Sequence, residues 1–227
     1  MKIIRFSVAD PVRSIGVGVA GLLVGNLDNE PDNAGIKRLR SDMTAKLSLE
    51  LSADVMKNDP ILAGFRELHS KIGKSNRRFP AASESLIGYF LSKGEIPAIN
   101  PIVDIYNMLS LDSRLSLGAH DTDKVDGNIV LRLTDGSERF VPLGATEPVA
   151  VTSGEYCYID DANDILCRLE HKQVEKTKVT DRTNSCFFII QGNASTPASL
   201  LEKTTNRLAG LLAEHCKGVA VRSWLFA

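Results

Sequence analysis

Residues 100–132, with the sequence NPIVDIYNMLSLDSRLSLGAHDTDKVDGNIVLR, place an apolar helix, a polar turn and a strand in direct succession. Asp104 and Asn107 are three residues apart in the helical part, so they share one face of that helix. A turn of ionisable residues held between a helix and a strand often carries binding or proton-transfer groups. We therefore place a candidate site in the turn, at His120, Asp121, Asp123 and Lys124.

The patterns outside this stretch predict an α+β fold. Capping residues and apolar periodicity indicate helices at about 33–51, 60–72, 83–94 and 100–112, and one that starts near 197. Period-two alternation indicates strands at 3–8, 15–24, 128–133, 138–141, 148–151, 156–159, 164–170, 185–190 and 219–225. Because helices come first and strands later, with no alternating βαβ units, a doubly wound parallel sheet is excluded.

The composition is that of one ordinary globular domain. The chain has 227 residues, 43% of them hydrophobic, and a formal net charge of -1. This balance argues against general coating of DNA, but basic residues gather in the first half of the chain. There are two basic clusters, and the first, at residues 37–46, fits a solvated helix face, which is the usual role of such clusters. For the second cluster we predict local contact with nucleic-acid phosphates: Lys71, Lys74, Arg77 and Arg78.

The cysteines and the N-terminal segment indicate a cytoplasmic protein. Four cysteines are scattered without metal-ligand spacing, so we expect buried, reduced thiols and no metal site. Residues 15–25 superficially suggest a signal peptide, but their Val and Gly alternation and the lack of a cleavage site favour a buried strand. No apolar segment is long enough to span a membrane, so we expect no membrane partner.

Residues 100–132 resemble the editing (B3/B4) domain of the phenylalanyl-tRNA synthetase beta subunit. In that domain an Asn-x-Val-Val-Asp-x-x-Asn helix leads into a His-Ala-Phe-Asp turn, a Gly, and a strand that carries an Arg. The matching positions here are Asn100–Asn107, Gly118–Asp121, Thr122–Lys124, Gly127 and Arg132. Downstream, residues 136–161 look more like freestanding B3/B4 proteins. The likeness covers about residues 60–212.

The resemblance implies a B3/B4 fold of layered mixed sheets with flanking helices. It places the editing domain at residues 59–227 and makes residues 1–58 an accessory element of the same domain. The implied function is trans-editing, which is hydrolysis of the ester of a mischarged tRNA without a cofactor. The catalytic residues would be His120, Asp121 and Thr180, of which His120 and Asp121 could position a water. The structural alternative is that Asp121 caps a turn and that Asp123 and Lys124 are simply solvated.

A second group of polar residues lies between residues 168 and 183. Thr177, Thr180 and Thr183 cannot all face one side of a strand, which favours a loop that presents hydroxyl groups, although threonine is also an ordinary strand residue. Freestanding B3/B4 proteins have a similar pattern of Arg, Gln and repeated Thr. The predicted substrate-binding residues are Asn107, Asp123, Lys124, Arg132, Glu155, Arg168, Gln173, Thr177 and Thr183.

Two departures from the synthetase affect specificity. Gly118 stands where the synthetase turn begins with His, and residues 186–190 lack its substrate-sensing Glu. We therefore expect a pocket reshaped for another amino acid, such as a non-canonical or arginine-like one. Two other classes stay open: a non-catalytic module that binds tRNA or an amino acid beside a synthetase, and a hydrolase of small aminoacyl compounds. The sequence does not indicate the amino acid, the tRNA species or the oligomeric state.

Overall fold

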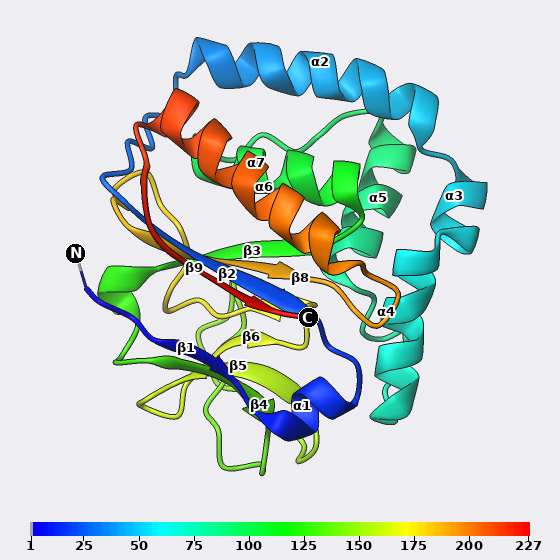
Figure 1. Cartoon of the computed structure of the whole chain (residues 1–227), viewed down its shortest axis with the longest axis vertical. Helices are drawn as coiled ribbons and strands as arrows, with labels where there is room; N and C mark the ends of the chain where they lie inside the picture. The colour runs from blue at the N-terminus through cyan, green and yellow to red at the C-terminus, as the bar shows by residue number, and fades with distance from the viewer. Residues whose placement is uncertain (1) are drawn as a thin grey trace.

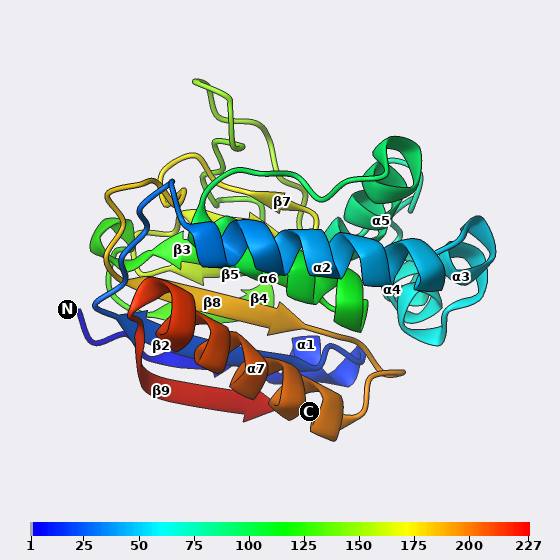
Figure 2. The same ribbon diagram turned by 90° about the horizontal axis from the view of Figure 1, so that it is seen from above.

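The computed structural model describes residues 2–227 and has three layers. One layer consists of the helices α6 (Pro101–Ser113) and α7 (Ala198–Cys216), which cover one face of a four-stranded sheet, and α2 (Ala34–Glu50) packs on their outer side (Figure 1). A five-stranded sheet lies against the other face of the four-stranded sheet. Seen from above, α2 runs across α6 and beside α7 (Figure 2).

The two sheets have different topologies. The four-stranded sheet has the order β3-β8-β2-β9 and is antiparallel throughout. Its strands are β2 (Val19–Gly25), β3 (Ser116–Asp121), β8 (Cys186–Gln191) and β9 (Val219–Phe226). The five-stranded sheet has the order β1-β4-β5-β6-β7, in which only β1 and β4 are parallel. Its strands are β1 (Phe6–Val8), β4 (Ile129–Leu133), β5 (Tyr156–Asp160), β6 (Ile165–Arg168) and β7 (Lys172–Gln173).

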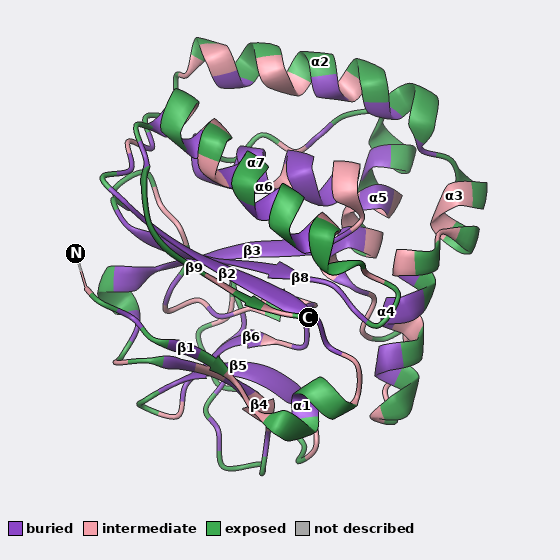
Figure 3. Ribbon diagram, viewed as in Figure 1, coloured by how far each residue is buried: buried purple, intermediate pink, exposed green. Residues whose placement is uncertain are grey.

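The four-stranded sheet separates two hydrophobic cores. Along β8, Phe188 and Ile190 point to the helical layer, whereas Phe187 and Ile189 point to the five-stranded sheet. Both faces of β2 and β8 are therefore buried, while β9 is exposed at the edge (Figure 3). Burial on both faces explains why these strands read as continuous apolar runs in the sequence.

Side chains define where the helices begin. Asn33, Asp59 and Asn100 accept hydrogen bonds from the first turns of α2, α4 (Pro60–Lys71) and α6. Ser52 does the same for α3 (Ala53–Asn58). The remaining helices are α1 (Asp10–Ser14) and α5 (Ala82–Lys93), and α5 ends at Gly94 with a left-handed φ of 71°.

The predicted α+β class is confirmed, and so are the long helices. The turn predicted at residues 118–121 was wrong, because this segment is strand β3, whose six residues are all buried against β8. The turn follows as a short 3-10 helix at Thr122–Lys124. Residues 138–141 and 148–151 form no strand in the described chain, since proline and glycine interrupt this region. The strand predicted to reach residue 170 ends at Arg168, where Leu169 adopts a φ of 55°.

Residues before 59 belong to both sheets, through β1 and β2. The four cysteines are free and buried, as expected. In residues 2–227, no helix is both long enough and apolar enough to cross a lipid bilayer.

Candidate functional site

A cavity of about 280 Å³ lies where the free edges of the two sheets meet. Tyr106 and Asn107 of α6 form one side, and Leu117 and Gly118 of the edge strand β3 form the next. The opposite side comes from β5, β6, β7 and the turn between β6 and β7, with Tyr158, Cys167, Glu170, His171, Lys172 and Gln173. A space of this size accepts a small molecule such as an amino acid.

The inner end of the cavity is a hydrogen-bond network around Glu170. One carboxylate oxygen of Glu170 accepts from the hydroxyl of Tyr156 and from Nε2 of Gln191, the latter at 3.0 Å. Tyr158 donates its hydroxyl to Oε1 of Gln191 at 2.5 Å. The other oxygen of Glu170 lies 2.6 Å from Nε2 of His69. These buried side chains therefore hold one another in fixed positions.

His69 and Glu170 form a buried ion pair. Burial alone would lower the pKa of His69, but the hydrogen bond and the negative charge of Glu170 outweigh it and raise that pKa. When His69 is protonated, its positive charge lies directly against the carboxylate of Glu170. Removal of one partner of such a pair leaves the other charge buried and alone, which is strongly destabilising.

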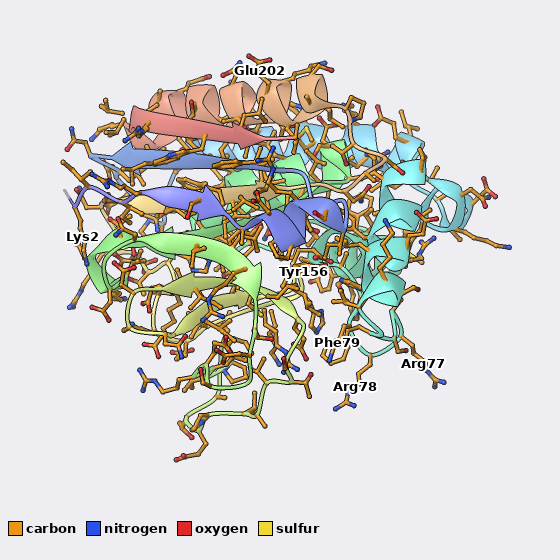
Figure 4. The ribbon with its side chains drawn as sticks, turned by 60° about the horizontal axis from the view of Figure 1, so that its bottom comes forward. Lys2, Arg77, Arg78, Phe79, Tyr156 and Glu202 are labelled. Carbon is orange, nitrogen blue, oxygen red and sulfur yellow. The ribbon has the colours of Figure 1, made fainter. Side chains whose placement is uncertain are left out.

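A second hollow of about 600 Å³ adjoins the cavity, and His171 and Lys172 line both. We call it the basic groove, defined by Lys74, Arg78, Arg168, His171 and Lys172 around the ring of Phe79. The charged groups of Lys74, Arg78 and Arg168 lie 5.8, 5.5 and 5.3 Å from the centre of that ring. Figure 4 shows Arg78 beside Phe79, extending into solvent.

Glu155 anchors two of these cations. It is fully buried, accepts from Nε and Nη2 of Arg168 at 2.6 and 2.8 Å, and accepts from Nζ of Lys74 at 2.5 Å. Burial would raise the pKa of Glu155, but the hydrogen bonds from Arg168, Lys74 and Thr152 outweigh it and lower that pKa to about 2. The carboxylate therefore stays ionised and fixes the base of the groove.

The comparisons give the family of the chain from its sequence and a similar fold from a solved structure. A model of the B3/4 domain matches residues 66–217, more than half of the chain. The chain belongs to the B3/4 domain family. Its fold is similar to that of an N-terminal fragment of the phenylalanyl-tRNA synthetase beta subunit from Pyrococcus horikoshii, with a TM-score of 0.52 and 15% identity. That likeness covers 97% of this chain and 51% of the fragment, so the chain spans about half of the fragment's length. No curated protein matches the chain in sequence.

The residues predicted as catalytic lie together in this B3/4 domain, but they do not line the cavity. Nδ1 of His120 lies 2.8 Å from the hydroxyl of Thr177, and the hydroxyl of Thr183 donates to Asp121 at 2.9 Å. The backbone N–H of Thr180 donates to the hydroxyl of Thr183. The predicted cluster thus exists as a hydrogen-bonded unit that ties β3 to the 177–183 loop.

His120 is buried and neutral within that unit. Burial lowers the pKa of its imidazole to about 3, and its Nε2 has no hydrogen-bond partner among residues 2–227. Asp121 caps the 3-10 turn by accepting from the N–H of Asp123, and Lys124 lies 3.5 Å from it. These contacts follow the structural alternative that the sequence left open.

The other predicted residues divide between the cavity, the groove and the scaffold. Asn107 and Gln173 line the cavity, and Lys74 and Arg168 line the groove. Arg132 instead pairs with Glu138 at 2.6 Å in the turn after β4. Lys71 donates to the carbonyl of Ile15, and Arg77 extends into solvent (Figure 4).

Sequence reasoning missed Glu170, His171, Gln191 and Phe79 as site residues. The run Arg168–Gln173 did signal the turn that carries Glu170 and His171. Nothing in the sequence signals Gln191, which reaches the cavity only because β8 pairs with β3 in this register.

Three aspartates of the B3/4 domain could hold a metal ion by their spacing. Carboxylate oxygens of Asp126, Asp160 and Asp164 lie within 4.8 Å of one another. However, Nζ of Lys176 lies 2.7, 2.9 and 2.6 Å from them, in that order. An ammonium group thus supplies the positive charge that a cation would bring.

Proposed function

We propose that this B3/4 domain is a trans-editing deacylase that hydrolyses the ester between an amino acid and the 3′ end of a mischarged tRNA. The observation that carries the proposal is the junction of an amino-acid-sized cavity with a basic groove that contains an aromatic ring. An aminoacylated tRNA end has matching parts: an amino acid, a stackable base and phosphates. The family's place in phenylalanyl-tRNA synthetase supports tRNA as the partner.

The parts of the substrate fit the two hollows by their chemistry. The amino acid would enter the cavity toward Gln191 and Glu170, with Asn107 and Gln173 beside it. The phosphates would meet Arg78 and Lys172, and a terminal base would stack on Phe79. The ester would then lie at the junction, beside His171.

Strand β3 would supply a backbone donor for the charge that develops on the ester oxygen. The N–H of Asp121 donates away from β8, to the carbonyl of Thr177 at 2.9 Å. Because alternate residues of an antiparallel strand share this direction, the N–H of Leu117 is directed to the same free edge, where Leu117 lines the cavity. Preorganised donors of this kind stabilise an oxyanion.

The test is deacylation of a panel of correctly and incorrectly charged tRNAs, in chelator, by wild type and by groove variants. Arg78→Ala and Lys172→Ala should raise KM and each reduce the dependence of log(kcat/KM) on log salt by about 1. Arg77→Ala is the matched control, because Arg77 is adjacent but does not line the groove. Hydrolysis of no species would overturn the proposal.

The burial of the His120 cluster favours a second candidate, a binding module without turnover. Deacylation and equilibrium binding measured side by side distinguish the two, with Gln173→Ala as the variant, because Gln173 lines the cavity and the His120 cluster does not. If wild type binds tRNA or an amino acid tightly, hydrolyses nothing, and loses affinity in Gln173→Ala, the protein is a binding module.

A further inference from the structure

His171 occupies a turn that borders both the cavity and the basic groove. It follows β6 directly, where the left-handed Leu169 (φ 55°) reverses the chain. A buried leucine rarely adopts this conformation, so the surrounding structure must hold it. Glu170 of this turn reaches the inner end of the cavity, while the adjacent His171 lines the junction.

The imidazole ring of His171 is held in one orientation. Its Nδ1 lies 2.7 Å from the carbonyl oxygen of Pro80, and the ring of Phe79 packs edge-on against it at 5.8 Å. The turn itself is tied to α5, because the N–H of Ala82 donates to the carbonyl of Glu170 at 3.0 Å. The ring therefore keeps its position without a bound ligand.

The contact with Pro80 also fixes the tautomer. A carbonyl oxygen only accepts hydrogen bonds, so Nδ1 must carry the proton and Nε2 keeps a free lone pair. Within residues 2–227, Nε2 of His171 has no hydrogen-bond partner, although the residue is only half-buried. A basic nitrogen thus borders the two hollows without a protein partner.

The surroundings keep this imidazole neutral at physiological pH. Burial lowers the pKa of His171, and the positive charges of Lys172 and His69 act in the same direction. The carbonyl of Pro80 and the carboxylate of Glu170 oppose them only in part.

We propose that Nε2 of His171 is the general base of the deacylation, an inference that rests on the proposed function. A water held by Nε2 attacks the ester carbonyl carbon, and its proton moves to Nε2 as the carbon–oxygen bond forms. When the tetrahedral intermediate collapses, the bond to the ribose oxygen breaks and that oxygen takes the proton from the imidazolium. The products are a free amino acid and a tRNA with a free terminal hydroxyl, and His171 is regenerated.

The test compares His171→Ala with wild type on the best tRNA substrate of the panel. We expect kcat to fall at least about 100-fold, with the affinity for uncharged tRNA changed less than about 3-fold. In wild type, kcat should rise with pH and reach its plateau below pH 6.5, because the pKa of His171 is lowered. This rise should be absent in the variant. Imidazole added to the variant should restore part of the rate. His215→Gln, at the distant end of α7, is the matched control.

Three results would overturn the inference. The first is a His171→Ala variant that keeps kcat within about 3-fold of wild type. The second is an equal loss of kcat and tRNA affinity without rescue by imidazole, which would make His171 a structural residue. In both cases the wild-type activity stands, so only the role of His171 fails. If wild type itself hydrolyses no ester, the proposed function fails and the inference fails with it.

Discussion

Gly118 and Gln173 lie so close that a methyl group on Gly118 would overlap the amide nitrogen of Gln173. Gly118 belongs to the edge strand of one sheet and Gln173 to the edge strand of the other. The amide of Gln173 therefore lies in the cavity between the two free edges, directly over Gly118. A Cβ at residue 118 would displace this amide.

Replacing this glycine should damage the cavity with little effect on the fold. We expect Gly118→Ala to displace Gln173 and to lower kcat/KM of deacylation about 100-fold. Gly88→Ala is the control, because a Cβ at Gly88 meets open space and alanine favours a helix. The double variant Gly118→Ala, Gln173→Ala should have the same kcat/KM as Gln173→Ala alone if the two residues act through this contact. A further loss in the double variant would contradict this.

The buried imidazole of His120 should make the protein sensitive to mild acid. Its pKa is about 3 in the folded state, against about 6.5 in an unfolded chain. As pH falls below 6.5, the unfolded state binds a proton that the folded state does not, so stability decreases. Between pH 6.5 and 5 this amounts to about 2 kcal/mol.

Urea denaturation of His120→Gln at these two pH values checks the assignment. The variant should lose about 2 kcal/mol less than wild type over this range. Equal pH dependence of wild type and His120→Gln would show that His120 titrates normally in the folded protein.

Glu155 should act on stability in a lower pH range. Because its pKa is lowered to about 2, against about 4.5 when unfolded, its ionised form stabilises the fold above pH 4.5. This contribution, about 3 kcal/mol, is lost as pH falls from 4.5 to 2. The free energies of unfolding of wild type and Glu155→Gln should therefore differ most at pH 7 and converge near pH 2. A constant difference across the range would contradict the ion-pair role.

A divalent cation should bind between Asp126, Asp160 and Asp164 only when the ammonium group of Lys176 has been removed. Lys176→Met leaves three carboxylates facing one another, so we expect a loss of about 3 kcal/mol, partly restored by millimolar Ca²⁺. The control is Lys178→Met, because Lys178 is exposed and its pair with Glu175 contributes less than about 1 kcal/mol. Calcium should leave the wild-type unfolding midpoint unchanged. Stabilisation of wild type by calcium would instead indicate a native metal site.

The four thiols should be unreactive in the folded protein. Burial raises the pKa of Cys157 and Cys216 to about 12, and it also raises the pKa of Cys167 and of Cys186. A thiol reagent such as dithionitrobenzoate should label four cysteines in urea and react far more slowly without it. Rapid labelling of one cysteine in the native protein would show that its side chain is accessible.

The sequence predicted elements whose signals are local. Helix α6 follows from Asn100 as a cap, Pro101 in the first turn and apolar periodicity, all within a few residues. Strand β3 was mistaken for a turn because His120 and Asp121 look like surface residues. Their partners, Thr177 and Thr183, lie about sixty residues away, so only the folded chain shows that their polar groups are satisfied.

The same reason limited the prediction of the site. Asn107 and Gln173 were identified from the resemblance and line the cavity. Glu170 and Gln191 meet through the pairing of strands that are distant in the chain, a relationship that no local pattern records. Arg132 resembled a ligand-binding residue, but its guanidinium forms an ion pair with Glu138 in the turn after β4.

The position of β2 in the four-stranded sheet constrains how the protein can form during synthesis. This apolar strand begins at residue 19, yet both of its neighbours, β8 and β9, lie beyond residue 185. A ribosome therefore produces most of the chain before either neighbour is available, and until then the strand has exposed edges. Nascent chains that stop before β8 should be targets for chaperones and prone to aggregate, whereas the finished chain closes the sheet in one late step.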